Sequence, residues 1–207
     1  VEDPDGTVRP LPELWSDAGV RMNEGGCDPD GRFYCGSMAY DQSAGAACLY
    51  RLAPNGSVEV VLDHVTVSNG LEWSPDGSRA YYNDTATGTV SVFDYDTATG
   101  LTNRRTFAEL PDGGRPDGLT VDADGGVWTA VSNGGAVYRY SADGALVEKL
   151  AVPARKVTAC TFGGEHLDQL FITTSQENID TGEDPMAGSL FRAEVGVKGL
   201  PVRLFAG

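Results

Sequence analysis

Oxygen-bearing side chains recur along this chain at intervals that would allow several of them to bind one metal ion. Asn23, Asn69 and Asp117 open three segments that align without gaps, and the segments start 46 and 48 residues apart. Thr158 opens a weaker copy 41 residues further on. Amide and carboxylate oxygens are the ligands that hard cations such as Ca²⁺, Mg²⁺ and Mn²⁺ prefer. An asparagine or aspartate at a strand start often bonds only to its own backbone, so both interpretations stay open for each residue.

The recurring segments also carry the turn signals of a repeated β structure. Each strong copy ends in an Asp-Gly pair, and such pairs favour tight turns between antiparallel strands. Repeats of about 40 to 50 residues with four strands each are typical of β-propeller blades. We therefore expect second strands at residues 32–38, 79–83, 126–131 and 169–174, third strands at residues 47–52, 89–94, 136–140 and 188–192, and outer strands at residues 58–62, 104–108 and 146–150.

The repeat accounts for four blade cores within one domain, residues 1–207. Residues 7–14 resemble an outer strand, and we expect them and the tail at residues 201–206 to belong to flanking blades. A closed propeller covers every sheet edge, and about four and a half blades do not close comfortably into a ring. The chain is therefore interpreted as a single all-β propeller domain that is incomplete on its N-terminal side.

Composition narrows the classes of partner. The chain carries 30 acidic and 15 basic residues, a net charge of −15, which repels nucleic acid and anionic membranes. No apolar run approaches the roughly 20 residues that cross a bilayer. The four cysteines form no C-x-x-C pair, which favours free thiols in a cytoplasmic protein over a disulfide framework. We expect no nucleic-acid partner and no membrane partner.

In a propeller, the first strand of each blade lines the central channel, so the residues that open the repeats should converge at one rim. Sites assembled from several elements around a shared cavity are common places for ligands. Arg21 precedes Asn23 by two residues, and its guanidinium could hold a hydroxyl-rich or anionic substrate there. Asp41 follows a second strand and could reach the same rim. Each has a plainer interpretation, Arg21 as a surface residue and Asp41 as a loop-capping carboxylate.

Six segments together resemble one known family. They are residues 21–33, 67–77, 103–105, 115–125, 158–164 and 205–207. From Gly19 onward, and in this order, they are similar to the regucalcin (SMP30)/gluconolactonase-like proteins. The resemblance implies a six-bladed β-propeller with one divalent metal ion at its centre. It points to Ca²⁺ first, with Zn²⁺, Mg²⁺ or Mn²⁺ as alternatives.

The resemblance also implies roles for individual residues. Asn69 and Asp117 match two of the family's metal ligands, and Arg21 and Asn23 match its substrate-contacting pair. Asp41 stands where some members place an acidic substrate contact. The family's third ligand, a glutamate in an L-G-E-G-P-like motif, has no counterpart in this sequence. We therefore expect it to come from roughly 80 preceding residues of a family-length chain, or from a second chain that supplies the missing blades.

The implied roles favour metal-dependent hydrolysis of a sugar-type lactone. The metal would polarise the lactone carbonyl, and Asp117 would be both a ligand and the general base. Arg21, Asn23 and Asp41 would hold the hydroxyl groups of the substrate. A non-catalytic propeller that binds metal or sugar through the same residues is the alternative. An interaction platform of the WD-repeat kind lacks its Gly-His and Trp-Asp signatures here, and a propeller piece without a working site also stays open.

Overall fold

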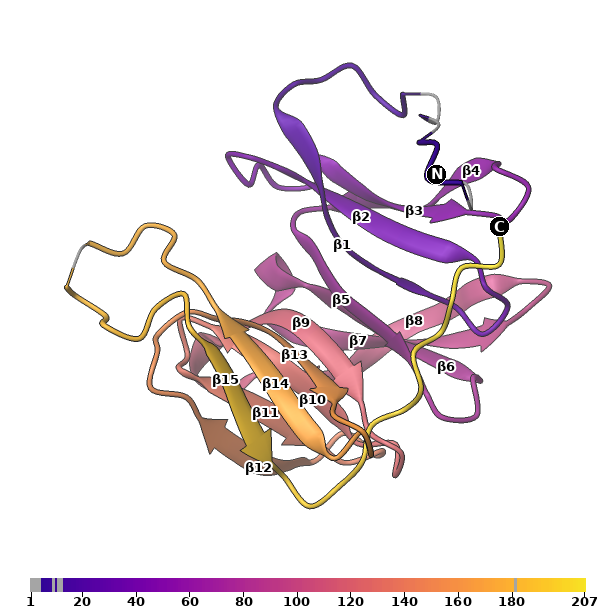
Figure 1. The fold of residues 1–207 in the computed structure, drawn as a ribbon. Helices are drawn as coiled ribbons and strands as arrows, with labels where there is room; N and C mark the ends of the chain where they lie inside the picture. Colours follow the sequence, from indigo (N-terminus) through magenta and orange to yellow (C-terminus); the bar gives the residue numbers. More distant parts are fainter. Residues whose placement is uncertain (1–4, 9, 11–12, 181) are drawn as a thin grey trace.

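The computed structural model describes residues 5–8, 10, 13–180 and 182–207, and within these ranges the chain is dominated by β-strands (Figure 1). It forms four antiparallel sheets, three with four strands and one with three. Two short 3₁₀ turns, η1 (Thr85–Thr87) and η2 (Pro111–Gly113), are the helical elements of this part of the chain. Across the same ranges, no helix has the length and apolar character that a membrane crossing requires.

Each sheet is a meander in which consecutive strands pair, as in a propeller blade. Blade 1 consists of β1 (Val20–Cys27), β2 (Phe33–Ala39), β3 (Ala47–Leu52) and β4 (Val58–Val65). Blade 2 consists of β5 (Ser68–Trp73), β6 (Arg79–Asp84), β7 (Thr89–Asp96) and β8 (Gly100–Glu109). Blade 3 consists of β9 (Arg115–Val121), β10 (Val127–Ser132), β11 (Ala136–Tyr140) and β12 (Leu146–Ala151). Blade 4 consists of β13 (Val157–Gly163), β14 (Gln169–Thr174) and β15 (Leu190–Glu194).

The Asp-Gly pairs lie at the turns where the repeat predicted them. Gly31, Gly77 and Gly125 have φ angles of +74°, +72° and +82°, a region that glycine enters without steric cost. In blade 1, the Gly31 N–H donates to the Asp28 carbonyl at 3.0 Å, which closes the turn between β1 and β2. Blades 2 and 3 repeat this turn, so the all-β propeller fold predicted from the sequence is confirmed.

Several strand boundaries differ from the predictions, and one predicted strand reaches beyond the described residues. The largest shifts are in outer strands, since β8 begins at Gly100, four residues before the predicted start, and β4 ends at Val65, three residues after the predicted end. β15 begins at Leu190, two residues after the predicted start at residue 188, because Gly188 has a φ of +80° and belongs to the preceding turn. The tail at residues 201–206 is not a strand of a further blade. The outer strand expected at residues 7–14 includes residues 9, 11 and 12, which lie outside the described residues.

The hydrophobic core lies between neighbouring blades. The inner strands β1, β5, β9 and β13 contact one another in this order around the channel. Trp73 of blade 2 is fully buried and meets Tyr34 of blade 1 edge to face, with ring centroids 5.2 Å apart. Trp128 of blade 3 is fully buried too and meets Phe162 of blade 4 at 6.0 Å. Such aromatic pairs bury large apolar areas and fix how adjacent blades pack.

A β-bulge interrupts each inner strand at the same level of the channel. In blade 1, Met22 pairs with Ser37 and Gly25 pairs with Cys35, so two residues of β1 face a single residue of β2. The register of β5, β9 and β13 shifts at the equivalent place. Bulges re-aim side chains locally. The four bulges therefore place one polar residue of each repeat together at the channel.

The C-terminal segment runs back across the blades instead of extending a sheet (Figure 1). Gly199 forms an isolated bridge with Asp122 of blade 3. Arg203 Nη1 then donates to Glu72 Oε1 of blade 2 at 2.8 Å, and the Ala206 N–H donates to the Gly31 carbonyl of blade 1 at 2.9 Å. The segment thus links three blades at the end of the channel opposite the bulged polar residues.

Candidate metal and substrate site

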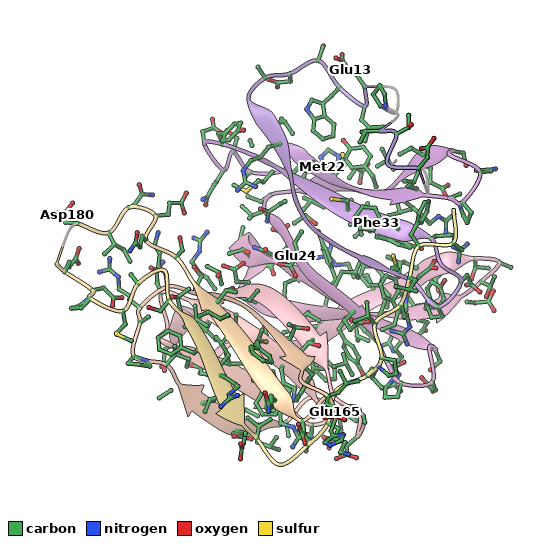
Figure 2. All side chains as sticks on the ribbon, in the orientation of Figure 1. Glu13, Met22, Glu24, Phe33, Glu165 and Asp180 are labelled. Carbon is green, nitrogen blue, oxygen red and sulfur yellow. The ribbon has the colours of Figure 1, made fainter. Side chains whose placement is uncertain are left out.

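The bulged residues surround a cavity of about 550 Å³ at the mouth of the central channel. Its lining from the inner strands includes Arg21, Asn23, Glu24, Asn69, Asp117 and Thr158. Every candidate residue predicted from the sequence therefore lines this cavity except Asp41. Figure 2 labels Met22 and Glu24 on β1, which brings Arg21 and Asn23 to the site.

A chain of hydrogen bonds crosses from blade 1 to blade 2 at the cavity wall. Arg21 Nη1 donates to Asn23 Oδ1 at 2.8 Å, and Asn23 Nδ2 donates to Asn69 Oδ1 at 3.1 Å. Asn69 Nδ2 in turn donates to Thr85 Oγ1 at 2.6 Å. Because its amide nitrogen is held by Thr85, Asn69 keeps its oxygen on the side of Asn23. A carbonyl-type oxygen has two lone pairs, so Asn69 Oδ1 retains acceptor capacity for a ligand.

Asp117 is held at the axis through its main chain. Its carbonyl accepts a hydrogen bond from Asn83 Nδ2 at 2.6 Å, and Asn83 also donates to Thr129 Oγ1 at 2.9 Å. Burial raises the pKa of the Asp117 carboxyl to about 7, against the lowering effects of the Gly118 N–H and the Arg115 guanidinium. The backbone anchor leaves this carboxyl available to the cavity.

Glu24 is a channel residue that the sequence reasoning missed. It follows Asn23 in the β1 bulge and lines the same cavity as Asp117. Burial, and then the negative charge of Asp117, raise the pKa of the Glu24 carboxyl to about 8. The signal was present in the aligned repeats, because Gly70 and Gly118 hold the equivalent position in the next two copies. A glutamate at a position that is glycine in the next two repeats is the signal that could have identified Glu24 as a channel residue.

Asp41 lies in an exposed loop after β2 and does not line the cavity. Its carboxylate accepts hydrogen bonds from the Ser43 hydroxyl at 2.7 Å and the Ser43 N–H at 3.0 Å, which lower its pKa. The neighbouring Gln42 lines the cavity and accepts from Arg115 Nη2 at 3.2 Å. The substrate contact of Asp41 stays a prediction, and Gln42 is the residue of this loop that reaches the rim.

The blade 4 side of the cavity is polar. The Thr158 hydroxyl shares a hydrogen bond of 2.9 Å with the Thr173 hydroxyl of the neighbouring strand. Lys156 Nζ donates to the Glu177 carbonyl and lies 3.8 Å from the Glu177 carboxylate. Thr158 is therefore bonded within its own blade, and it lines the same cavity as Asn23 and Asn69.

The family model described as SMP-30/gluconolactonase/LRE-like region matches residues 1–176. The chain belongs to this family. Zebrafish (Danio rerio) regucalcin is 38% identical over 210 aligned residues, covering 97% of this chain and 71% of the relative. The pentonolactonase XacC of Haloferax volcanii is 39% identical over 194 residues, covering 89% of this chain and 66% of the relative. The resemblance inferred from the motifs is thereby confirmed.

A solved structure in the SMP-30/gluconolactonase family has the same fold. The regucalcin of Agrobacterium tumefaciens, described as a calcium-binding protein, superimposes with a TM-score of 0.85 at 30% identity. The match covers 90% of this chain and 65% of that one. The chain thus spans about two thirds of the length of the relatives it matches. Four blades within two thirds of a relative's length correspond to six blades in the whole relative, which agrees with the expected six-bladed architecture.

The donors at the channel mouth fit a hard divalent cation better than a soft one. Among the described residues, no three histidine, cysteine, aspartate or glutamate side chains gather as a metal-binding group. Three carboxyls line the mouth, those of Glu24, Asp117 and Glu177, beside amides that include Asn23 and Asn69. Glu24 and Asp117 are the two carboxyls on the inner strands. Both carboxyls have raised pKa values because their charges are buried without a full counter-charge. A cation bound between them would supply that counter-charge, and oxygen donors suit Ca²⁺ and Mg²⁺.

Proposed function

We propose that this member of the SMP-30/gluconolactonase family is a metal-dependent hydrolase of sugar-type lactones, with one divalent ion, Ca²⁺ first, on the propeller axis. One observation carries the proposal: Asn69 and Asp117, from adjacent blades, line a single cavity of about 550 Å³. A relative that is 39% identical is a pentonolactonase, and a structural relative is described as calcium-binding. Asn69 and Asp117 would hold the ion, which when bound would polarise the lactone carbonyl.

Asp117 is the proposed general base of the reaction. Without a bound ion, burial raises the pKa of the Asp117 carboxyl to about 7. A bound cation would lower that pKa and keep the carboxyl ionised, the form that accepts a proton. The carboxylate would take a proton from water as the water oxygen bonds to the lactone carbonyl carbon. The ring C–O bond then breaks, and the ring oxygen takes up a proton. The product is the open-chain sugar acid, with the atoms of one water added.

The hydrogen-bonded pair of Arg21 and Asn23 would position the substrate. The Arg21 guanidinium donates to Asn23 Oδ1 and to the Met22 carbonyl, so its orientation is set before a ligand arrives. A planar guanidinium of fixed orientation can donate to neighbouring hydroxyl groups of a sugar. Holding the lactone next to Asp117 in this way would make the reaction between bound groups effectively unimolecular, which lowers its entropic cost. Asp41 remains a proposed further contact on the same loop as Gln42.

A non-catalytic calcium-binding or sugar-binding propeller is the second candidate. It is favoured by one specific observation, that the Agrobacterium tumefaciens structure is described by calcium binding alone. This function would use the same ligands but would need no general base. Turnover of a lactone therefore separates the two candidates.

The proposal is tested by following hydrolysis of aldonolactones by the purified protein with and without a chelator. We expect turnover above the spontaneous rate, loss of turnover after chelation, and recovery when Ca²⁺, Zn²⁺, Mg²⁺ or Mn²⁺ is returned. Heat-denatured protein at the same concentration is the control. Metal binding without turnover would support the second candidate, and turnover that survives chelation would contradict metal dependence.

A further inference from the structure

Two arginines that line the mouth cavity, Arg21 and Arg115, have no carboxylate partner. The salt bridges among the described residues include neither guanidinium. By contrast, Arg32, Arg139 and Arg203 each have a carboxylate oxygen at 2.7–2.8 Å. The whole chain carries 30 acidic and only 15 basic residues, so carboxylates are plentiful. The positive charges of Arg21 and Arg115 are therefore available to a ligand in the cavity.

Arg115 is the one of these two arginines that the proposed reaction does not use. It opens β9, the inner strand of blade 3, and its Nη2 donates to Gln42 Oε1 at 3.2 Å. Gln42 belongs to the loop after β2 in blade 1, so this bond joins two blades that are not neighbours in the propeller. A guanidinium has five N–H donors, and this bond uses one of them. The bond orients the Arg115 guanidinium at the mouth and leaves donors for a ligand.

The loop that holds Arg115 is built with local backbone strain. Gln42 has a φ of +56°, in the left-handed region that residues with a Cβ rarely adopt. The turn is closed by the Gln42 N–H, which donates to the Ala39 carbonyl at 3.0 Å, and by the Asp41 carboxylate, which accepts from Ser43. Strained conformations that neighbouring contacts maintain are concentrated at ligand sites. Here the strained residue is the one whose amide reaches Arg115.

Arg115 lies at a useful distance from the proposed reaction centre. Arg115 and Asp117 stand two residues apart on β9, and both line the mouth cavity. Residues at this spacing lie roughly 7 Å from each other along a strand. That is the scale of the distance between the carbonyl of a six-carbon sugar lactone and a group on its far carbon. Arg115 is exposed whereas Asp117 is partly buried, so the far end of such a substrate would point to the open rim.

The carboxyls of the cavity restrict where an anion could bind. Glu24 and Asp117 are partly buried, and they would repel an anionic group placed deep in the cavity. The Glu177 carboxylate lies 3.8 Å from Lys156 Nζ, which offsets its charge. The exposed rim at Arg115 is therefore the part of the cavity that favours an anion.

We infer that Arg115, oriented by Gln42, is a subsite for an anionic group, so that the preferred substrate is a sugar lactone that also carries a carboxylate or a phosphate. This inference rests on the proposed function, because it names the substrate class of the same site. A planar guanidinium binds both groups with two parallel, charge-assisted hydrogen bonds. Arg21 and Asn23 would then hold the hydroxyl groups between the lactone carbonyl and the anionic end.

The test compares kcat/KM for glucono-1,5-lactone with kcat/KM for the same lactone bearing a phosphate or a carboxylate at its sixth carbon, with saturating Ca²⁺ present. The wild type should prefer at least one anionic lactone by about tenfold. Arg115→Gln should lower this anionic-to-neutral ratio by about tenfold or more, mainly through KM, because the charge-assisted bonds are lost. Arg115→Lys should retain part of the ratio, since it keeps the charge without the planar fork.

The ratio is the readout because any effect of the substitution on Asp117 acts on both substrates alike. Arg79→Gln is the matched control, since Arg79 begins β6, is exposed, takes part in no salt bridge within the described residues and does not line the cavity. It should leave the ratio unchanged. A preference for only the phosphate or only the carboxylate would support the subsite and identify its ligand. An anionic-to-neutral ratio near one in the wild type, or an unchanged ratio in Arg115→Gln, would overturn the inference while turnover of the neutral lactone upheld the proposed function.

Equilibrium binding tests the subsite without relying on turnover. In calorimetric titrations, the wild type should bind 6-phosphogluconate or glucarate about tenfold more tightly than gluconate, and Arg115→Gln should lose this preference. The preference should also shrink at high ionic strength, because the subsite is exposed. If no lactone is hydrolysed but this preference is found, the proposed function fails and the subsite stands. Equal affinity of the wild type for the three acids would overturn the subsite.

Gln42→Gly separates the orientation of Arg115 from the folding of the loop. Glycine adopts a φ of +56° without steric cost, so this variant should unfold at the wild-type temperature or above. Its anionic-to-neutral ratio should nevertheless fall by about threefold or more, because Arg115 loses the partner that orients it. A ratio equal to that of the wild type would contradict the role assigned to Gln42.

Discussion

Replacing Asp117 with asparagine should lower kcat for lactone hydrolysis by about 10³-fold or more while the fold is retained. The change removes the proposed general base and a charged ligand of the ion at once. The fold should persist because the Asn83 bond to residue 117 uses the main-chain carbonyl, which the substitution leaves in place. Initial rates and circular dichroism of both proteins provide the measurement. Asp112→Asn, an exposed change in η2 five residues earlier, is the matched control and should keep full activity.

The same variant should change how the stability of the metal-free protein depends on pH. The folded protein holds the Asp117 proton up to a pH of about 7, whereas an unfolded chain releases it near pH 4. Between these values the folded state binds more protons, so wild-type stability falls as the pH rises through this window. Asp117→Asn should weaken that fall. Wild-type turnover in Asp117→Asn, or an unaltered pH dependence of unfolding, would contradict the role assigned to this carboxyl.

Replacing Asp122 with alanine should destabilise the protein by about 3–5 kcal/mol, the cost of leaving a buried charge without its partner. Asp122 is fully buried, and its carboxylate accepts from Trp128 Nε1 at 2.9 Å, Arg139 Nε at 2.8 Å and the Gly126 N–H at 2.7 Å. The variant would leave the guanidinium and the indole N–H unpaired beside the blade 3 core. Denaturant unfolding measures the effect.

Asp124→Ala, an exposed change in the same turn, is the control for Asp122 and should cost less than about 1 kcal/mol. Blade 1 uses an equivalent group, since Asp28 is buried and bonds Arg32 Nε and the Tyr95 hydroxyl, both at 2.7 Å. In blades 1 and 3 the aspartate after the inner strand therefore stabilises the blade and is not part of the channel site, whereas blade 2 has Ser74 at the equivalent position. A loss of less than about 1 kcal/mol in Asp122→Ala would show that the network does not stabilise the blade.

Much of the fold was predictable because the repeat contains residues with strong local conformational preferences. The Asp-Gly pairs determine the turns, since glycine readily adopts the positive φ that they require. Once the turns are placed, Asn23, Asn69 and Asp117 occupy the same point of successive blades and must converge on the axis. The start of β15 was misplaced by two residues because its preceding turn contains no such pair.

Other features depend on contacts between distant parts of the chain. Glu24 was missed because its neighbour Asn23 fitted the expected pattern, and only the bulge brings both residues to the channel. The C-terminal segment depends on Arg203 meeting Glu72, a pair separated by more than a hundred residues. Asp41 was expected at the rim, but loop geometry presents Gln42 to the cavity. Such long-range pairings and loop conformations leave little trace in local sequence.

The central claim, that Asn69 and Asp117 hold a divalent ion on the propeller axis, is tested most directly by locating the ion. Crystals of the protein soaked in Mn²⁺ would give an anomalous difference map in which a peak marks the position of the metal ion. The account predicts one strong peak in the mouth cavity, at a ligand distance of about 2.0–2.6 Å from Asn69 Oδ1 and the Asp117 carboxylate. A map with no peak there at saturating Mn²⁺, or with its peak elsewhere on the molecule, would contradict the account.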